Sequence, residues 1–83
     1  MLNEFNLLTT TSRGNEKDAI SELRYLLEQV GDSNAVIAKT GVSGLIAAKT
    51  ALNPFETIEK LREILHERPY EFRYTLRIIP VEA

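Results

Sequence analysis

Two segments of the chain space their apolar residues about 3.6 positions apart, as an amphipathic helix does. The first segment covers residues 15–30 and the second covers residues 54–68. Both patterns predict a helix that buries one side and leaves the other in water. The apolar positions are Ala19, Ile20, Leu23, Leu26, Leu27 and Val30 in the first segment, and Ile58, Leu61, Ile64 and Leu65 in the second.

The ends of both predicted helices carry start and stop signals. Asn15 stands at the N-cap position of the first helix, and Gly31 stands where a left-handed C-terminal cap belongs. Asn53 is the expected N-cap of the second helix. Pro69 favours the end of that helix, because the residue before a proline disfavours the helical conformation.

The remaining apolar runs predict four β-strands. The last of them alternates its side chains most regularly. The middle two are joined by Gly-Val-Ser-Gly at residues 41–44, which suits a hairpin loop with positive φ at one glycine or both. The predicted strands cover residues 4–10, 35–39, 45–50 and 71–81.

The predicted order of elements is therefore β-α-β-β-α-β. Right-handed crossover connections place the four strands in one antiparallel sheet with both helices on the same face, which is the α+β ferredoxin-like fold. The 83 residues suffice for one domain of this kind and not for two.

Strand side chains alternate between the two faces of a sheet, so one face packs on the helices and the other stays open. With Phe72, Tyr74, Leu76 and Ile78 under the helices, the open face is expected to hold five apolar residues and four cations. The apolar interface candidates are Leu8, Ile37, Leu45, Ala47 and Ile79, and the cations, which are candidate RNA or anion contacts, are Lys39, Lys49, Arg73 and Arg77. A rimmed apolar patch commonly marks an interface, although Lys and Arg stems also cover the apolar residues of a half-solvated sheet.

Composition narrows the kinds of function that such a domain performs. The formal net charge of −2 argues against binding of nucleic acid by bulk electrostatics. There is no cysteine, which excludes disulfides and thiolate ligands and fits a reducing compartment. Neither a membrane span nor a signal peptide is visible, and we expect a cytoplasmic protein without a cofactor or a metal.

One loop has the residue types of an anion site. Ser12-Arg13-Gly14-Asn15 precedes the first predicted helix, where exposed N–H groups and the helix dipole attract anions and Arg13 offers a bidentate contact to phosphate. Gly14 and Asn15 equally serve as a turn and a helix cap, with Arg13 in solvent. Both interpretations remain open from the residues alone.

No constellation of residues indicates catalysis. His66 is the only histidine, and it lies near the end of a glutamate-rich helix without a second histidine or a cysteine. The glycines at 41 and 44 match the spacing of an RNA-clamping loop, but they join two strands rather than two helices. We therefore predict no catalytic residues.

Three stretches carry a family resemblance: LLTTTSRGNEKDAISELRYLL, TGVSGLIAAKTALNPFETIEKLREI and FRYTLRIIPVE. Together they resemble the N-terminal part of THUMP-domain proteins, most closely the group that serves as the tRNA-binding partner in cytidine acetylation. The most specific pieces are the TSRGNE corner and the TGVSGL hairpin. In that family the segment is a ferredoxin-like domain ahead of the THUMP core, and this chain ends about where that core would begin.

The resemblance implies a non-catalytic accessory domain that helps to position tRNA in RNA modification. Its expected partners are tRNA, held weakly by this domain alone, and an adjacent THUMP domain or partner protein, with a homodimer through the open face as a further possibility. An alternative is an ACT-like module that binds a small molecule or forms a dimer. An acylphosphatase-like enzyme, with Arg13 in the first β-α loop, lacks its glycine-rich signature here and is the least favoured.

Overall fold

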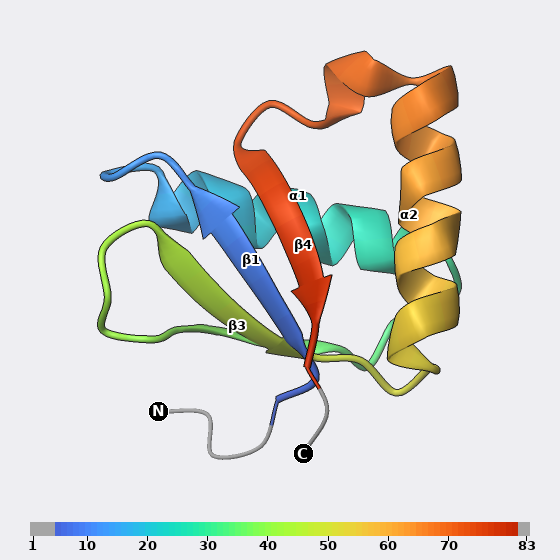
Figure 1. The fold of residues 1–83 in the computed structure, drawn as a ribbon, viewed down its shortest axis with the longest axis horizontal. Helices are drawn as coiled ribbons and strands as arrows, with labels where there is room; N and C mark the ends of the chain where they lie inside the picture. Colours follow the sequence, from blue (N-terminus) through green and yellow to red (C-terminus); the bar gives the residue numbers. More distant parts are fainter. Residues whose placement is uncertain (1–4, 82–83) are drawn as a thin grey trace.

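The computed structural model describes residues 5–81 and confirms the predicted ferredoxin-like order of elements (Figure 1). The four strands form one sheet in the order β2-β3-β1-β4, with every neighbouring pair antiparallel. Neither helix of this described part is long and apolar enough to cross a membrane. The elements are β1 (Leu7–Thr11), α1 (Glu16–Gln29), β2 (Val36–Lys39), β3 (Leu45–Lys49), α2 (Pro54–Glu67), a 3₁₀ turn (Pro69–Glu71) and β4 (Thr75–Pro80).

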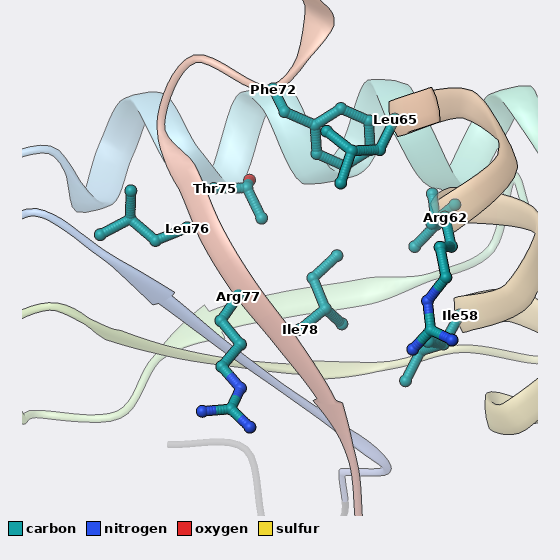
Figure 2. Close-up of a pocket in the computed structure, with 9 residues that line it drawn as sticks. Ile58, Arg62, Leu65, Phe72, Thr75, Leu76, Arg77 and Ile78 are labelled. Carbon is teal, nitrogen blue, oxygen red and sulfur yellow. The ribbon is translucent and has the colours of Figure 1, made fainter. Parts of the chain in front are cut away.

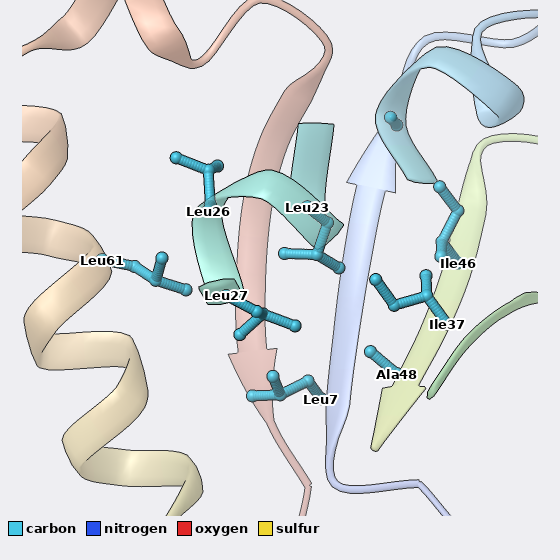
Figure 3. Packing of buried hydrophobic residues seen from close by; sticks show 9 residues of the cluster. Leu7, Leu23, Leu26, Leu27, Ile37, Ile46, Ala48 and Leu61 are labelled. Atoms are coloured by element: carbon cyan, nitrogen blue, oxygen red, sulfur yellow. The ribbon is translucent and has the colours of Figure 1, made fainter. Parts of the chain in front are cut away.

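Both helices contribute to one hydrophobic core, but they pack on the sheet differently. In Figure 1, α1 crosses behind the strands, whereas α2 stands beside β4. The apolar stripe of α1 is deeply buried, and α2 reaches the same core through Leu61 (Figure 3). On α2, Leu61 and Thr57 are the buried residues, while Leu65 keeps 43% of its surface exposed. Ile58 and Ile64 are partly buried and also pack against this core, so α2 is held by a stripe that leaves Leu65 half exposed.

The caps largely follow the sequence signals. Gly31 has a φ of +98°, as the predicted left-handed cap of α1 requires. The Asn53 side chain accepts hydrogen bonds from the N–H groups of Phe55 and Glu56 at 2.9 and 3.2 Å, as an N-cap does. Asn15 does occupy the N-cap position of α1, but its side chain makes no capping hydrogen bond.

The last strand is shorter than predicted, because the segment before it binds α1 instead of β1. The carboxylate of Glu22 accepts the backbone N–H groups of Arg73, Tyr74 and Thr75, the last at 2.7 Å. A shift of register opposite Thr10 and Thr11 then leaves Leu76 without a partner in the ladder. Leu76 is 67% exposed, so the prediction that it packs under the helices is wrong.

A buried polar cluster fastens three connections at one end of the sheet. The Asp32 carboxylate accepts hydrogen bonds from the Asn34 N–H at 3.1 Å, the Ala51 N–H at 2.9 Å and the Thr50 hydroxyl. Thr50 in turn exchanges two hydrogen bonds with the side-chain amide of Asn6 at 2.9 and 3.1 Å. These bonds join the α1–β2 loop, the β3–α2 loop and the start of β1.

Candidate interface on the open sheet face

The face of the sheet turned away from α1 carries apolar side chains on all four strands. The register fixes its members, because residues paired across neighbouring strands lie on the same face. Leu8 pairs with both Ala47 and Ile79, and Thr10 pairs with both Leu45 and Arg77. The prediction that Leu8, Leu45, Ala47 and Ile79 lie on the open face is therefore confirmed.

The predicted phase of β2 is wrong. Ile37 pairs with Ala48 and belongs to the core, and Lys39 pairs with Ile46, so both point to the helix side of the sheet. Val36 and Ala38 take the open face in their place, opposite Lys49 and Ala47. In the sequence Val-Ile-Ala-Lys, residues that would face either side of the sheet include apolar ones, so the alternation does not decide which side is buried. In the structure β2 packs against α1, and Ile37, which is larger than its two neighbours, is the residue that becomes buried there.

The open face also has fewer cations than predicted. Arg73 precedes β4, where its N–H group is held by Glu22, and so it is not part of a strand. With Lys39 on the other face, Lys49 and Arg77 are the two cations of the predicted four that the register places here. The basic character of the face is correspondingly reduced, while its apolar character is kept.

The apolar residues of this face are unevenly covered. Ala47 is buried at the centre between its neighbours, Leu8 and Leu45 are half-buried, and the outer residues Val36 and Ile79 are 50% and 39% exposed. Within residues 5–81 no helix covers this side (Figure 1). The exposed residues lie on the two edge strands and the half-buried ones lie between them, so the apolar residues cross the whole face. A contiguous apolar patch of this kind is typical of a surface that another molecule covers.

The predicted anion corner holds a carboxylate of the chain itself. Gly14 adopts a φ of +92°, and Glu16, the first residue of α1, accepts the Gly14 N–H with Oε1 at 3.0 Å. The second oxygen of Glu16 accepts the N–H of Gly44 in the β2–β3 hairpin at 2.8 Å. Arg13 extends into solvent beside this pair. The N–H groups of Gly14 and Gly44 are therefore bound by a carboxylate of the chain, whereas from the sequence the N–H groups of this corner were candidate donors to an external phosphate.

The electrostatics of Glu16 follow from these two bonds. The backbone N–H of Gly44, and after it further backbone N–H groups that include that of Gly14, hold the pKa of Glu16 below its ordinary value. Lys39 lowers the pKa further through its positive charge, although it is the weakest of these causes. The charged form is therefore the one that the corner binds.

Sequence reasoning missed the carboxylates that organise the loops. Glu16 accepts one backbone N–H from a segment distant in sequence, and Glu22 and Asp32 each accept at least two such backbone or hydroxyl protons. Distant partners of this kind leave no local signal. His66 lies near the end of α2 as predicted, exposed beside Glu63 and Glu67. Among residues 5–81 no group of three histidine or acidic side chains is arranged to hold a metal ion.

The fold and this surface define a class: a small α+β ferredoxin-like domain in which, within residues 5–81, no helix covers one face of the sheet. Comparison with protein-family models, with curated proteins and with solved structures found no match to this chain.

Proposed function

We propose that this chain is a non-catalytic accessory domain of a THUMP-type tRNA-modification protein. In this proposal the open sheet face packs against a neighbouring domain or a partner protein, and a few cations make weak contacts with the tRNA backbone. The observation that carries it is the uncovered apolar face formed by Leu8, Leu45 and Ile79 on adjacent strands. The resemblance of the TSRGNE corner and the TGVSGL hairpin to that family supplies the RNA context.

The cations best placed for RNA are few and dispersed. Lys49 and Arg77 lie on the open face, and Arg13 is exposed at the corner between β1 and α1. Because Glu16 already accepts the N–H groups of Gly14 and Gly44, we expect Arg13 to be the group at this corner that reaches a phosphate, with Gly14 and Asn15 as a turn and a helix start. A net charge of −2 adds no long-range attraction, so the proposal requires weak binding by the domain alone.

The salt dependence of tRNA binding tests the RNA part of this proposal. Fluorescence anisotropy with a labelled tRNA transcript, measured from 20 to about 200 mM salt, gives the slope of log K against log salt. Removal of one phosphate contact lowers this slope by roughly 0.7–0.9. We expect such a decrease for Arg77→Ala and for Arg13→Ala, and no decrease for Arg24→Ala, an exposed control on α1. Binding that stays tight at 200 mM salt, or a slope unchanged in both test variants, would contradict the proposal.

The packing part is tested by a charge placed in the uncovered face. Ile79→Lys is expected to leave the free energy of unfolding of the isolated chain within about 0.5 kcal/mol, because the side chain is already partly in water. The matched substitution Ile46→Lys, in the core, is expected to unfold the chain. If Ile79→Lys also unfolded it, the face would serve stability rather than docking. In the same samples, thermal stabilisation by free amino acids would favour the ACT-like alternative.

A further inference from the structure

A groove of about 320 Å³ lies between α2 and β4 (Figure 2). It exists because α2 stands beside the edge of the sheet and its contacts with the core, through Leu61 with Ile58 and Ile64, leave Leu65 partly in water. Its apolar surface comes from Ile58 and Leu65 of α2, Phe72 before β4, and Leu76 and Ile78 of β4. Leu65 and Leu76 are 43% and 67% exposed, so this surface is in contact with water.

The groove runs along the edge of the sheet. β4 is the last strand in the order β2-β3-β1-β4, and its pairing with β1 leaves its other edge toward α2. The Val81 N–H donates to the Asn6 carbonyl of the β1 side at 2.9 Å. Because backbone groups alternate in direction along an antiparallel strand, the N–H and C=O of Ile78 point away from β1 and toward the groove. Pro80, two residues further along, faces the same edge, but a proline has no N–H group that could stay unpaired there.

The charges of the groove are of one sign. Arg62 from α2 and Arg77 from β4 line it, and no carboxylate is among its lining residues. Figure 2 shows the two arginine side chains extending in the same direction from opposite walls. Although α2 is rich in glutamate, neither arginine has an ion-pair or hydrogen-bond partner within residues 5–81. Two unpaired guanidinium groups beside an apolar surface complement an acidic side chain that is flanked by apolar ones.

We propose that this groove binds an extended segment of a partner protein, which adds as a further strand to β4. Main-chain hydrogen bonds to Ile78 would align the segment, apolar side chains would enter the groove, and one acidic side chain would lie between Arg62 and Arg77. A second copy of this chain, docked groove to groove, brings the two arginines against their own equivalents and is disfavoured by like charge. The inference rests on the groove and not on the proposed tRNA contacts, and although Arg77 serves in both, Arg62 belongs to the groove alone and keeps the two tests separate.

Selection from a displayed library of random 12-residue peptides tests this proposal on the intact chain. We expect enrichment of segments that alternate apolar residues with Asp or Glu. A selection in parallel on Arg62→Glu is expected to favour Lys or Arg at that position instead, and the best acidic peptide is expected to bind this variant about tenfold more weakly. Arg24→Glu, an exposed substitution on α1, is the matched control and leaves the preference unchanged. Arg62 is itself exposed, and circular dichroism verifies that both variants fold.

Amide exchange then distinguishes a strand from other modes of binding. With a ¹⁵N-labelled chain, the selected peptide is expected to slow exchange of the Ile78 amide and to leave that of Arg24 unchanged. Failure to enrich any sequence class, equal affinity for Arg62→Glu, or a bound peptide that leaves Ile78 exchange unaltered would overturn the proposal. Sedimentation that shows a dimer of the free chain, dispersed by Leu76→Asp in the groove, would assign the groove to a second copy and would also overturn the proposal.

Discussion

Replacement of Gly44 by alanine tests how closely the β2–β3 hairpin must approach β1. Gly44 has a φ of +78°, a conformation that costs an L-residue such as alanine roughly 1–2 kcal/mol. A Cβ at this position would stand 2.8 Å from the backbone oxygen of Thr11, closer than van der Waals contact allows. The Thr11 N–H donates to the Gly44 carbonyl at 2.9 Å, so the neighbouring backbone is held in place and cannot withdraw freely.

The expected loss of stability is the sum of these two effects. The backbone shifts that make room for an extra methyl group in a packed region cost about 1–3 kcal/mol. Added to the conformational cost of roughly 1–2 kcal/mol, this means that Gly44→Ala should lower the free energy of unfolding by about 2–5 kcal/mol. Domains have roughly 0.05–0.15 kcal/mol of stability per residue, or about 4–12 kcal/mol for a chain of this length. The substitution therefore removes a large part of the total. Alanine keeps the backbone N–H that Gly44 donates to Glu16, so the carboxylate contact is not deleted.

Equilibrium urea unfolding, followed by circular dichroism, measures this loss. With a slope of about 1 kcal/mol per molar urea, the midpoint of Gly44→Ala should fall by about 2 M or more. Gly41→Ala is the matched control, because Gly41 has a φ of +91° but nothing within 4 Å of an added Cβ. Its loss should be only the conformational part, roughly 1–2 kcal/mol. Equal midpoints for the two variants would refute the argument that the close approach to Thr11 matters.

Three further predictions concern the packing and polar contacts of the described residues. Leu61→Ala should destabilise the chain by about 2–5 kcal/mol in urea unfolding, because Leu61 is the buried apolar contact of α2, and Leu65→Ala should cost clearly less. Asp32→Ala should cost roughly 2–4 kcal/mol by the same measurement, since it leaves two N–H groups and a hydroxyl without their acceptor, whereas Ser33→Ala in the same loop should be near neutral. The folded-state pKa of Glu16 lies below its ordinary value of 4.5, so its stabilising effect is complete above that pH and is lost as the pH falls through the lowered value. The difference in urea midpoint between the wild-type chain and Glu16→Gln should therefore be largest near pH 7 and shrink in acid, and a difference constant down to pH 3 would contradict this assignment.

The elements governed by local signals were predictable. The glycine at 31 and the Asn53-Pro54 pair placed helix ends within about one residue of where they lie, because caps act on backbone groups a few positions away. The hairpin at residues 41–44 followed from its glycines for the same reason, and both have positive φ. Local chemistry is sufficient where both partners of an interaction are close in sequence.

The errors arise where the partner is distant. Glu22 accepts the N–H groups at the start of β4, although it lies about fifty residues earlier in the sequence. The residues around Arg73 contain no signal that predicts this contact. The face of Ile37 depends on which neighbour α1 buries, because β2 is short and apolar at both phases. The groove beside β4 was not predicted, since the apolar stripe on α2 was assumed to be fully covered and Leu65 is not. The face on which the apolar candidates lie was therefore predicted correctly on β1, β3 and β4, and incorrectly on β2.

The two most recognisable sequence pieces are in physical contact. Glu16 of the TSRGNE corner accepts the N–H of Gly44 of the TGVSGL hairpin, and the Gly44 carbonyl accepts the N–H of Thr11 directly before the corner. Each piece thus supplies the other with hydrogen-bond partners, which gives Gly14, Glu16 and Gly44 a structural role without any ligand. Arg13 takes no part in these contacts, and its exposed side chain is the group at this corner to which the proposed function assigns an RNA contact. If Arg13→Ala lowers the affinity for tRNA and leaves the free energy of unfolding unchanged, then Arg13 acts in RNA binding while its neighbours hold the fold.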